Sequence, residues 1–206
     1  MQGKINEIIP EKVHAAITVV IEKMMRAIVS GSDLVTADPV TDAPLSLREA
    51  RAQAAIAAYR AAAAAEGGVA GAGGFALALA EFPTLIATKI KLLFDIAALY
   101  GHDGAKLSER LYILSIFQLT FSGGDHRTGT LAEMEGWDGR PHPDNLDTID
   151  WRKFQQEYRD HIDLAKLAQL LPVVGAPIGA IVNWRLVEQL GETAMNAYRL
   201  RWFAGR

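Results

Sequence analysis

The sequence predicts an all-α protein, a multi-helix bundle with two central layers of apolar helix that are rich in glycine and alanine. The first layer is Gly67–Gly101, in which no residue from Gly67 to Ala80 carries a charge. The second is Leu167–Trp184, which is apolar, rich in small residues and interrupted by prolines. No segment alternates polar and apolar residues for long enough to predict a strand. These observations favour helices that pack against one another.

Glycines four residues apart in each layer indicate close contact between helices. Gly67 and Gly71 fall on one helical face, and Gly175 and Gly179 repeat the spacing. Glycine costs roughly 1 kcal/mol against alanine inside a helix, so such a cluster needs a packing reason. Small residues at this spacing let another helix backbone approach closely. The two layers are therefore able to pack on one another, and we expect both to be buried.

Neither layer has the pattern of a membrane span. The uncharged stretch Gly67–Ala80 would make about 21 Å of helix, whereas the hydrocarbon core of a bilayer is roughly 30 Å thick. The second layer is longer, but Pro172 and Pro177 would kink or divide it. A buried pair of helices explains both stretches better.

The chain is expected to form a single helical domain, residues 1–206. Apolar residues at steps of three and four predict an amphipathic helix over residues 1–30. Ser46, with Glu49 three residues later, is typical of a capping box at the start of a helix that runs to Glu66.

Proline and glycine mark the boundaries that we expect for the next helix. Pro83 is a plausible first residue, and Gly101 stands where a C′ glycine would close it. Further helices are expected over residues 105–121, over residues 151–172, and from Asn183 to the C-terminus.

Residues 122–149 are expected to form a polar loop, rich in glycine and proline. A connection of this length is usually either functional or mobile. It contains His126, His142 and Asp144, and the next expected helix carries Glu157 and His161 on one face. These residues lack diagnostic ligand spacing, and an i,i+4 pair on a solvated helix face is the commoner arrangement. We therefore predict no metal site and no cofactor.

Composition excludes several classes of protein. The chain has 206 residues, a net charge of -3 and no cysteine. This charge argues against nucleic-acid binding, and the absence of cysteine excludes disulfides and thiolate chemistry. The charged N-terminus lacks the apolar run of a signal peptide, so a cytoplasmic protein is expected. No nucleophile elbow, Walker loop or zinc-protease motif is found.

Two polar residues at the borders of the apolar layers are candidate ligand-binding residues. Glu81 lies two residues before Pro83, where a carboxylate can bind a cation, act as an acid or base, or cap a helix. Acids favour the first turn of a helix, so capping is the ordinary explanation. Asn183 ends the second layer, where its side chain would more often satisfy helix-end backbone groups than bind a ligand.

The C-terminal helix combines arginines with large aromatic rings. Tyr198, Arg199, Arg201 and Trp202 are the candidate membrane-interface residues. Arginine at a helix C-terminus ordinarily complements the helix dipole. The same mixture also suits a membrane interface, where tryptophan and tyrosine lie at headgroup level. Both explanations remain open at the level of sequence.

Four segments resemble the bacterial EcsC family: AEFP at 80–83, YGHD at 100–103, LPVVGAPIGAIVN at 171–183 and AMNAYRLR at 194–201. The resemblance covers most of residues 47–203. It implies a mostly helical bacterial protein, in a family whose founding member is encoded beside an ABC transporter. It implies no particular reaction, so no catalytic residue is carried over. The positions of interest within these segments are Glu81, Tyr100, Gly101, Gly175, Gly179 and Asn183.

Two functions are compatible with this sequence. The first is a non-enzymatic cytoplasmic protein at the inner face of the membrane, which binds lipid or a membrane-protein partner such as a transporter. The alternative is a small-molecule binder or enzyme with a site near Glu81, Tyr100 and the 122–149 segment. The apolar composition and the lack of a catalytic motif favour the first. A soluble oligomer that packs its small-residue faces together is a third possibility.

Overall fold

The structure, a computed structural model, describes residues 19, 22–23, 25–29, 37–72, 74–143, 145 and 176–205. Within these residues the regular secondary structure is helical and no strand occurs, which confirms the all-α class. The elements are α3 (Leu45–Ala72), α4 (Gly74–Tyr100), α5 (Leu107–Phe121), α6 (Gly124–Met134), the short 3-10 helix η1 (Trp137–Gly139) and α9 (Ala176–Ala204).

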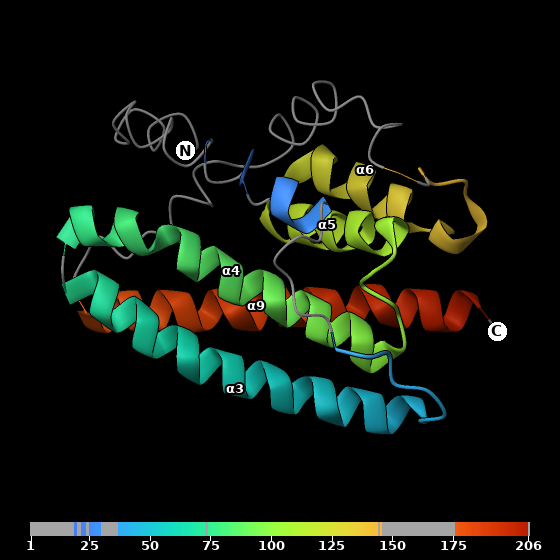
Figure 1. Cartoon of the computed structure of the whole chain (residues 1–206), viewed down its shortest axis with the longest axis horizontal. Helices are drawn as coiled ribbons and strands as arrows, with labels where there is room; N and C mark the ends of the chain where they lie inside the picture. Colours follow the sequence, from blue (N-terminus) through green and yellow to red (C-terminus); the bar gives the residue numbers. More distant parts are fainter. Residues whose placement is uncertain are drawn as a thin grey trace.

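The three long helices α3, α4 and α9 pack on one another, and α5 and α6 lie against one side of them (Figure 1). Helices α3 and α9 are antiparallel, because Glu49 meets Arg199 near one end and Gly67 meets Gly179 near the other. Helix α5 packs on α9 and α4, and α6 packs on α5. The core between these elements is formed by buried aliphatic and aromatic side chains from all of them except η1.

The two glycine-rich layers meet at Gly67 and Gly179. A Cβ atom added at Gly67 would lie 2.5 Å from the carbonyl oxygen of Gly179 and 2.9 Å from the Cβ of Asn183. No side chain fits there without moving the backbone of α9. The predicted packing of one layer on the other is therefore confirmed at this point. The surroundings of Gly71 and of Gly175 lie outside the described residues.

Helix α3 begins earlier and ends later than the sequence indicates. The carbonyl of Pro44 accepts hydrogen bonds from the backbone N–H groups of Leu47 and Arg48, at 3.1 and 3.2 Å. Ser46 therefore lies inside the first turn, and its assignment as the N-cap is wrong. The helix also continues past Glu66 through the glycines, because the close contact with α9 supplies the packing that glycine needs.

The course of helix α4 shows that two predictions, for Pro83 and for Glu81, are wrong. It runs without a break from Gly74 to Tyr100, so Pro83 lies inside the helix instead of opening it. A proline removes one backbone hydrogen bond, and packing of α4 against both α3 and α9 maintains the helix despite that loss. Glu81 is thus seven residues past the start and does not cap a helix N-terminus. Its side chain lies outside what the structure describes.

The predicted C-terminal boundary of this helix is confirmed at Gly101. Gly101 has a φ of 91°, in the left-handed region where glycine carries no Cβ penalty. Its N–H donates to the carbonyl of Ala98 at 3.0 Å, and the N–H of His102 donates to that of Ala97 at 2.9 Å. These two bonds define a Schellman motif, which satisfies carbonyls left unpaired at the helix end.

Residues 122–149 do not form one polar loop. Residues 124–134 form α6 and residues 137–139 form η1. Thr130 and Met134 on α6 are buried, and Trp137 packs edge-on against Tyr112 of α5 at a centroid separation of 5.1 Å. The buried Met134 and the packed ring of Trp137 explain why the segment folds onto α5. The expected helix at 151–172 lies outside the described residues, as does most of residues 1–30.

Helix α9 is longer than expected. It begins at Ala176 and passes through Asn183 to Ala204, so no helix boundary exists at Asn183. Pro177 is the second residue, where its missing N–H would have had no partner within the helix. Pro172 lies outside the described part of the chain.

We expect Gly67→Ala to lower the free energy of unfolding by about 1–3 kcal/mol, because the new methyl group would overpack a contact with backbone. Gly129→Ala is the matched control. Gly129 is an exposed glycine of α6 with no atom within 4 Å of an added Cβ. That change should raise stability by about 0.5–1 kcal/mol through helix propensity. Urea unfolding measures both, and equal responses of the two variants would contradict the packing argument.

Candidate functional site

A buried lysine joins the three long helices beside the glycine contact. Lys89 of α4 is 0% exposed, and its Nζ donates to Oδ1 of Asn183 on α9 at 2.6 Å. The Nδ2 of Asn183 donates in turn to the carbonyl of Ala63 on α3 at 2.8 Å. One ammonium group and one carboxamide thus connect α4, α9 and α3.

Burial controls the protonation of this lysine. Desolvation lowers the pKa of Lys89 from its usual 10.5 to about 8, and the nearby carboxylate of Glu66 opposes part of that shift. Glu66 accepts a hydrogen bond from the hydroxyl of Thr88 at 3.1 Å. At neutral pH the ammonium form therefore persists inside the protein. The side chain is sealed from solvent, so it offers no accessible chemistry within the described structure.

Asn183 is placed differently from the sequence-based expectation. It does not satisfy a helix end, because α9 extends on both sides of it. Its partner Lys89 was missed, although the sequence does carry a signal for it. Lys89 lies three residues from both Ile86 and Leu92, and four from Leu93, so it shares their apolar helix face. A lone lysine on such a face predicts a buried cation that needs an acceptor.

A second buried cluster connects the C-terminal part of α9 to α5 and η1. The hydroxyl of Tyr198 donates to Oε1 of Glu109 at 2.6 Å, and Nη1 of Arg201 donates to Oε2 of the same carboxylate at 2.8 Å. Arg201 also binds Asp138 of η1, with Nε 3.0 Å from Oδ2. Its guanidinium lies 4.4 Å from the ring centroid of Tyr112. The Tyr198 hydroxyl and the Arg201 guanidinium thus face carboxylate acceptors, and the guanidinium also faces an aromatic ring.

Tyr100 belongs to the aromatic part of this cluster. The rings of Tyr100 and His102 stack on Tyr198 at centroid separations of 5.5 and 5.0 Å. Burial raises the pKa of Tyr100 to about 12 and that of Tyr198 well above its usual value, and it lowers the pKa of His102. All three rings are therefore neutral at neutral pH. Tyr100 and Tyr198 are 3% and 0% exposed, so both rings lie in the interior.

The structure corrects the expected exposure of the C-terminal residues. Tyr198 is 0% exposed and the side chain of Arg201 is 8% exposed, so these two do not form a free surface. Arg199 is partly exposed, and it forms an ion pair with Glu49 of α3. Trp202 is half-buried. The physical reason is that Tyr198 and Arg201 lie on the inner side of α9, opposite the carboxylate of α5.

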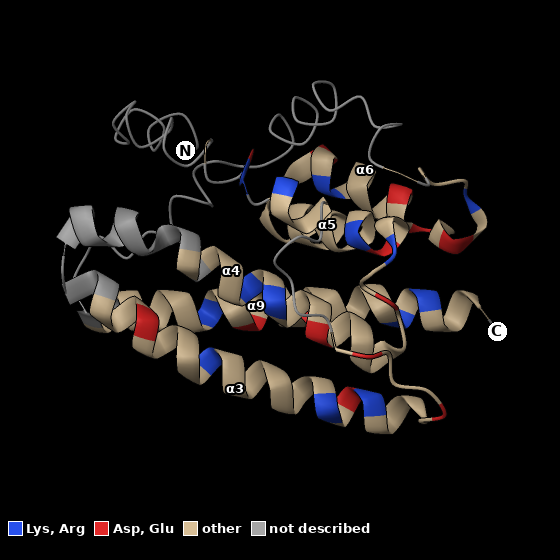
Figure 2. Ribbon diagram, viewed as in Figure 1, with Lys and Arg blue, Asp and Glu red and all other residues tan. Residues whose placement is uncertain are grey.

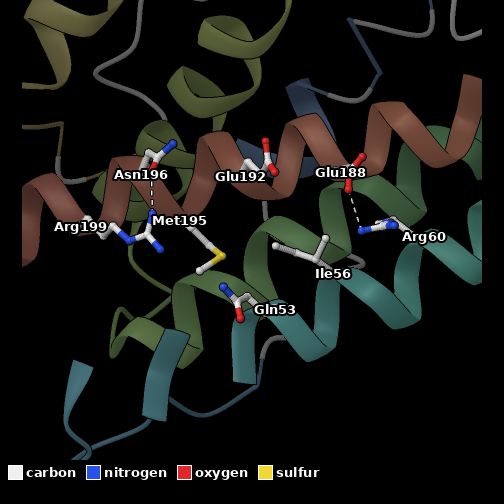
Figure 3. Close-up of a pocket in the computed structure, with 8 residues that line it drawn as sticks. All are labelled: Gln53, Ile56, Arg60, Glu188, Glu192, Met195, Asn196 and Arg199. Carbon is white, nitrogen blue, oxygen red and sulfur yellow. Dashed lines mark hydrogen bonds and ion pairs between the residues drawn. The ribbon is translucent and has the colours of Figure 1, made fainter. Parts of the chain in front are cut away.

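Two grooves lie beside α9. The first, of about 530 Å³, runs between α3 and α9 and is drawn in Figure 3. The second, of about 490 Å³, has a mostly apolar lining that includes Met134, Trp137, Leu200 and Ala204. Neither groove is lined by Tyr100 or Asn183. The structure therefore does not bring the predicted ligand-binding residues together around either groove.

The described residues contain no group of three or more side chains able to hold a metal ion. His142 stacks on Trp137 at 4.3 Å, and its Nε2 lies 2.8 Å from the carbonyl oxygen of that residue. Asp144, Glu157 and His161 lie outside the described part of the chain.

Comparison with known proteins places the chain in a family. The profile of the EcsC protein family matches residues 1–203. The chain belongs to the EcsC family. It is 45% identical over 202 residues to Protein EcsC of Bacillus subtilis (strain 168), an alignment that covers 98% of this chain and 84% of that protein. It is 32% identical over 138 residues to Uncharacterized protein YdbA of the same organism, covering 66% of this chain and 51% of that protein. No solved structure matches.

We expect Lys89→Met in this EcsC-family protein to change how stability depends on pH. The pKa of Lys89 in the folded state, about 8, lies below its usual 10.5, so the unfolded chain binds more protons between these values. The parent protein therefore gains stability as the pH rises through that window. Since one pKa unit corresponds to about 1.4 kcal/mol, it should gain about 2 kcal/mol relative to the variant between pH 7 and pH 10.

Urea unfolding at a series of pH values measures this difference. Lys91→Met is the matched control, because the Lys91 side chain is 51% exposed and pairs only one turn away with Asp95. It should follow the parent protein across the same pH range. If parent and Lys89→Met show parallel pH profiles, the buried ammonium does not control stability as proposed.

We expect Arg201→Gln to be much more destabilising than Arg199→Gln. Loss of Arg201 leaves the buried carboxylate of Glu109 without its cation, which typically costs about 3–5 kcal/mol. Arg199 is paired with Glu49 near the surface, and such a pair typically contributes about 0–1 kcal/mol. Thermal unfolding of the two variants compares them directly. Similar losses of stability in the two variants would show that breaking the buried ion pair costs no more than breaking the surface one.

Proposed function

We propose that this EcsC-family protein is non-enzymatic and acts at the inner face of the membrane, where it binds lipid or a membrane-protein partner. The observation that supports this is an uncharged end of the α3, α4 and α9 layer. This region, the charge-free end, consists of residues 67–80 and 176–184, none of which is charged. The contact between Gly67 and Gly179 brings its two stretches together.

In the folded protein the charge-free end combines uncharged parts of three helices, so it is larger than either uncharged stretch of the sequence alone. Helix α3 ends at Ala72, α4 begins at Gly74 and α9 begins at Ala176, so uncharged parts of three helices lie at the same end of the layer (Figure 1). Glu66, Glu81 and Arg185 are the first charged residues along these helices. Beyond them, charged residues recur along the described helices (Figure 2).

Two large apolar side chains of the charge-free end are exposed. Val69 on α3 is 65% exposed and Ile181 on α9 is 53% exposed. Each lies two residues from the glycine contact. Isolated exposed apolar residues are common on soluble proteins, but both of these lie in stretches that carry no charge. A lipid surface or an apolar partner would bury them.

The internal pairing of the polar clusters supports a non-enzymatic role. Lys89 and Asn183 bond to each other, and Glu109 binds Tyr198 and Arg201. A catalytic group needs access to substrate and an unoccupied donor or acceptor at the reacting atom. Within the described residues these clusters instead hold helices together.

None of the described helices is long and apolar enough to cross a membrane. We therefore propose a peripheral association through apolar burial. Because Arg201 is buried in ion pairs and Arg199 is paired with Glu49, cationic attraction is not the expected driving force. Binding should then depend little on salt, since screening acts on exposed charges.

We expect the double variant Val69→Asp, Ile181→Asp to lose membrane binding. A buried valine or isoleucine side chain contributes about 1.5–3 kcal/mol, so each substitution should weaken binding at least about tenfold. Flotation of the purified protein with liposomes, at low and at high salt, measures this. The parent protein should float under both conditions.

Leu47→Asp is the matched control, because Leu47 is 41% exposed and lies at the opposite end of α3. It should float like the parent protein. A parent protein that stays at the bottom of the gradient would contradict lipid binding. Flotation that survives the double variant would show that another surface is responsible.

A small-molecule binder is the second candidate function. The groove beside α6 and η1 supports it, because this mostly apolar cavity of about 490 Å³ has the size of a ligand pocket. The indole N–H of Trp137, which lines it, is buried and has no acceptor among the described residues. A ligand with an apolar body would fit the mostly apolar lining of the groove. This candidate gains support if flotation fails.

A further inference from the structure

The groove between α3 and α9 combines an apolar floor with charged walls (Figure 3). Its volume of about 530 Å³ lies within the usual range for small-molecule sites. The floor consists of Ile56 and Met195, which are 5% and 3% exposed. Gly191 allows this floor to form, because a Cβ there would lie 2.5 Å from the side chain of Ile56. The helices are thus in tight contact beneath an open groove.

The charges that line the groove balance one another. Arg60 and Arg199 contribute two positive charges, and Glu188 and Glu192 contribute two negative charges. A lining without net charge gives no advantage to a ligand of one sign alone. A ligand that carries both signs can pair with each wall separately.

Arg60 provides an anchored cation. Its Nη1 lies 2.8 Å from Oε1 of Glu188, and its guanidinium is 3.6 Å from the ring centroid of Trp184. The Nε–H of Arg60 is buried and has no acceptor among the described residues. That buried nitrogen is closed to a ligand, but Nη2 of the same guanidinium has no partner among the described residues and is not sealed, so an anionic oxygen in the groove can bind it.

Glu192 provides the complementary anion. It is exposed and has no cationic partner among the residues that the structure describes. It lies one turn beyond Glu188 on α9, about 6 Å along the helix axis. Because Arg60 pairs with Glu188, its guanidinium lies about one helical turn from Glu192 along α9.

We propose that this groove binds a small zwitterion, with its carboxylate on Arg60 and its ammonium group on Glu192. The charge balance, the apolar floor and the spacing of the two groups all favour such a ligand. Helix-anchored arginine and glutamate side chains give charge-assisted hydrogen bonds, which are stronger than neutral ones. The groove lies outside the charge-free end, so this inference does not rest on the membrane role.

The test uses zwitterions of increasing length: glycine, γ-aminobutyrate and ε-aminocaproate, titrated into the whole protein and followed by NMR. Butylamine and butyrate, which each carry one of the two charges, are the matched ligands. We expect saturable shifts of backbone signals at residues 53–60 and 188–199. The strongest shifts should come from the zwitterion whose charges are about one helical turn apart, with much weaker binding of the single-charge ligands.

Two variants locate the charges. Glu192→Gln changes an exposed side chain, and loss of one charge-assisted hydrogen bond should weaken binding about tenfold. Arg60→Lys keeps the positive charge but removes the planar guanidinium with its several N–H donors, and should weaken binding similarly. Glu133→Gln, on α6 and away from the groove, should leave binding unchanged.

Three results would overturn the proposal. The first is the absence of saturable shifts at the groove up to millimolar ligand. The second is equal binding of butylamine or butyrate, which would show that one charge suffices. The third is binding that Glu192→Gln leaves unaltered. Because none of these measurements involves lipid, they are independent of the flotation result.

Discussion

The structure depends on one place where α3 and α9 meet backbone to backbone. The carbonyl of Gly179 occupies the space that a side chain at Gly67 would need. This close approach brings Asn183 within hydrogen-bonding distance of the Ala63 carbonyl, and Asn183 then accepts from Lys89 of α4. A buried ammonium is costly unless it is hydrogen-bonded. The close packing of α3 on α9 therefore also places the hydrogen-bond partner of the buried ammonium. Glycine at positions 67 and 179 makes both possible.

A second cluster, about 22 Å farther along α9, attaches the same helix to the rest of the domain. Glu109 of α5 accepts from Tyr198 and Arg201, and Arg201 reaches Asp138 of η1. Buried ion pairs often contribute little net stability compared with apolar residues, but breaking one is costly. We therefore interpret this cluster as setting the position of α5 and η1 on α9. Helix α9 is thus held by polar contacts near both ends, with apolar packing between them.

This distribution of polar contacts separates two kinds of surface. Where the polar groups pair internally, the outer surface of the same helices is left either apolar, as at Val69 and Ile181, or lined with charges, as in the α3–α9 groove. The first surface favours partners through apolar burial, which salt affects little. The second favours ligands through charge pairing at a fixed spacing. The two proposals thus predict different responses to salt and to single substitutions, and each can fail alone.

The sequence by itself determined the helical class and the end of α4 at Gly101, because each follows from local periodicity or from a backbone conformation that only glycine readily adopts. The two glycine-rich layers were only partly predicted, because the first is divided between α3 and α4, and Val69 and Ile181 are exposed instead of buried. The resemblance to the EcsC family was also recognisable from short segments. Tertiary structure alone decided that α4 passes through Pro83 and that α9 passes through Asn183, since packing on neighbouring helices outweighs local signals for a boundary. It also decided that Tyr198 and Arg201 face inward, because their partner Glu109 is about 90 residues away in the chain. Periodicity identifies which side chains share a helix face, but the partner across that face depends on how distant helices pack.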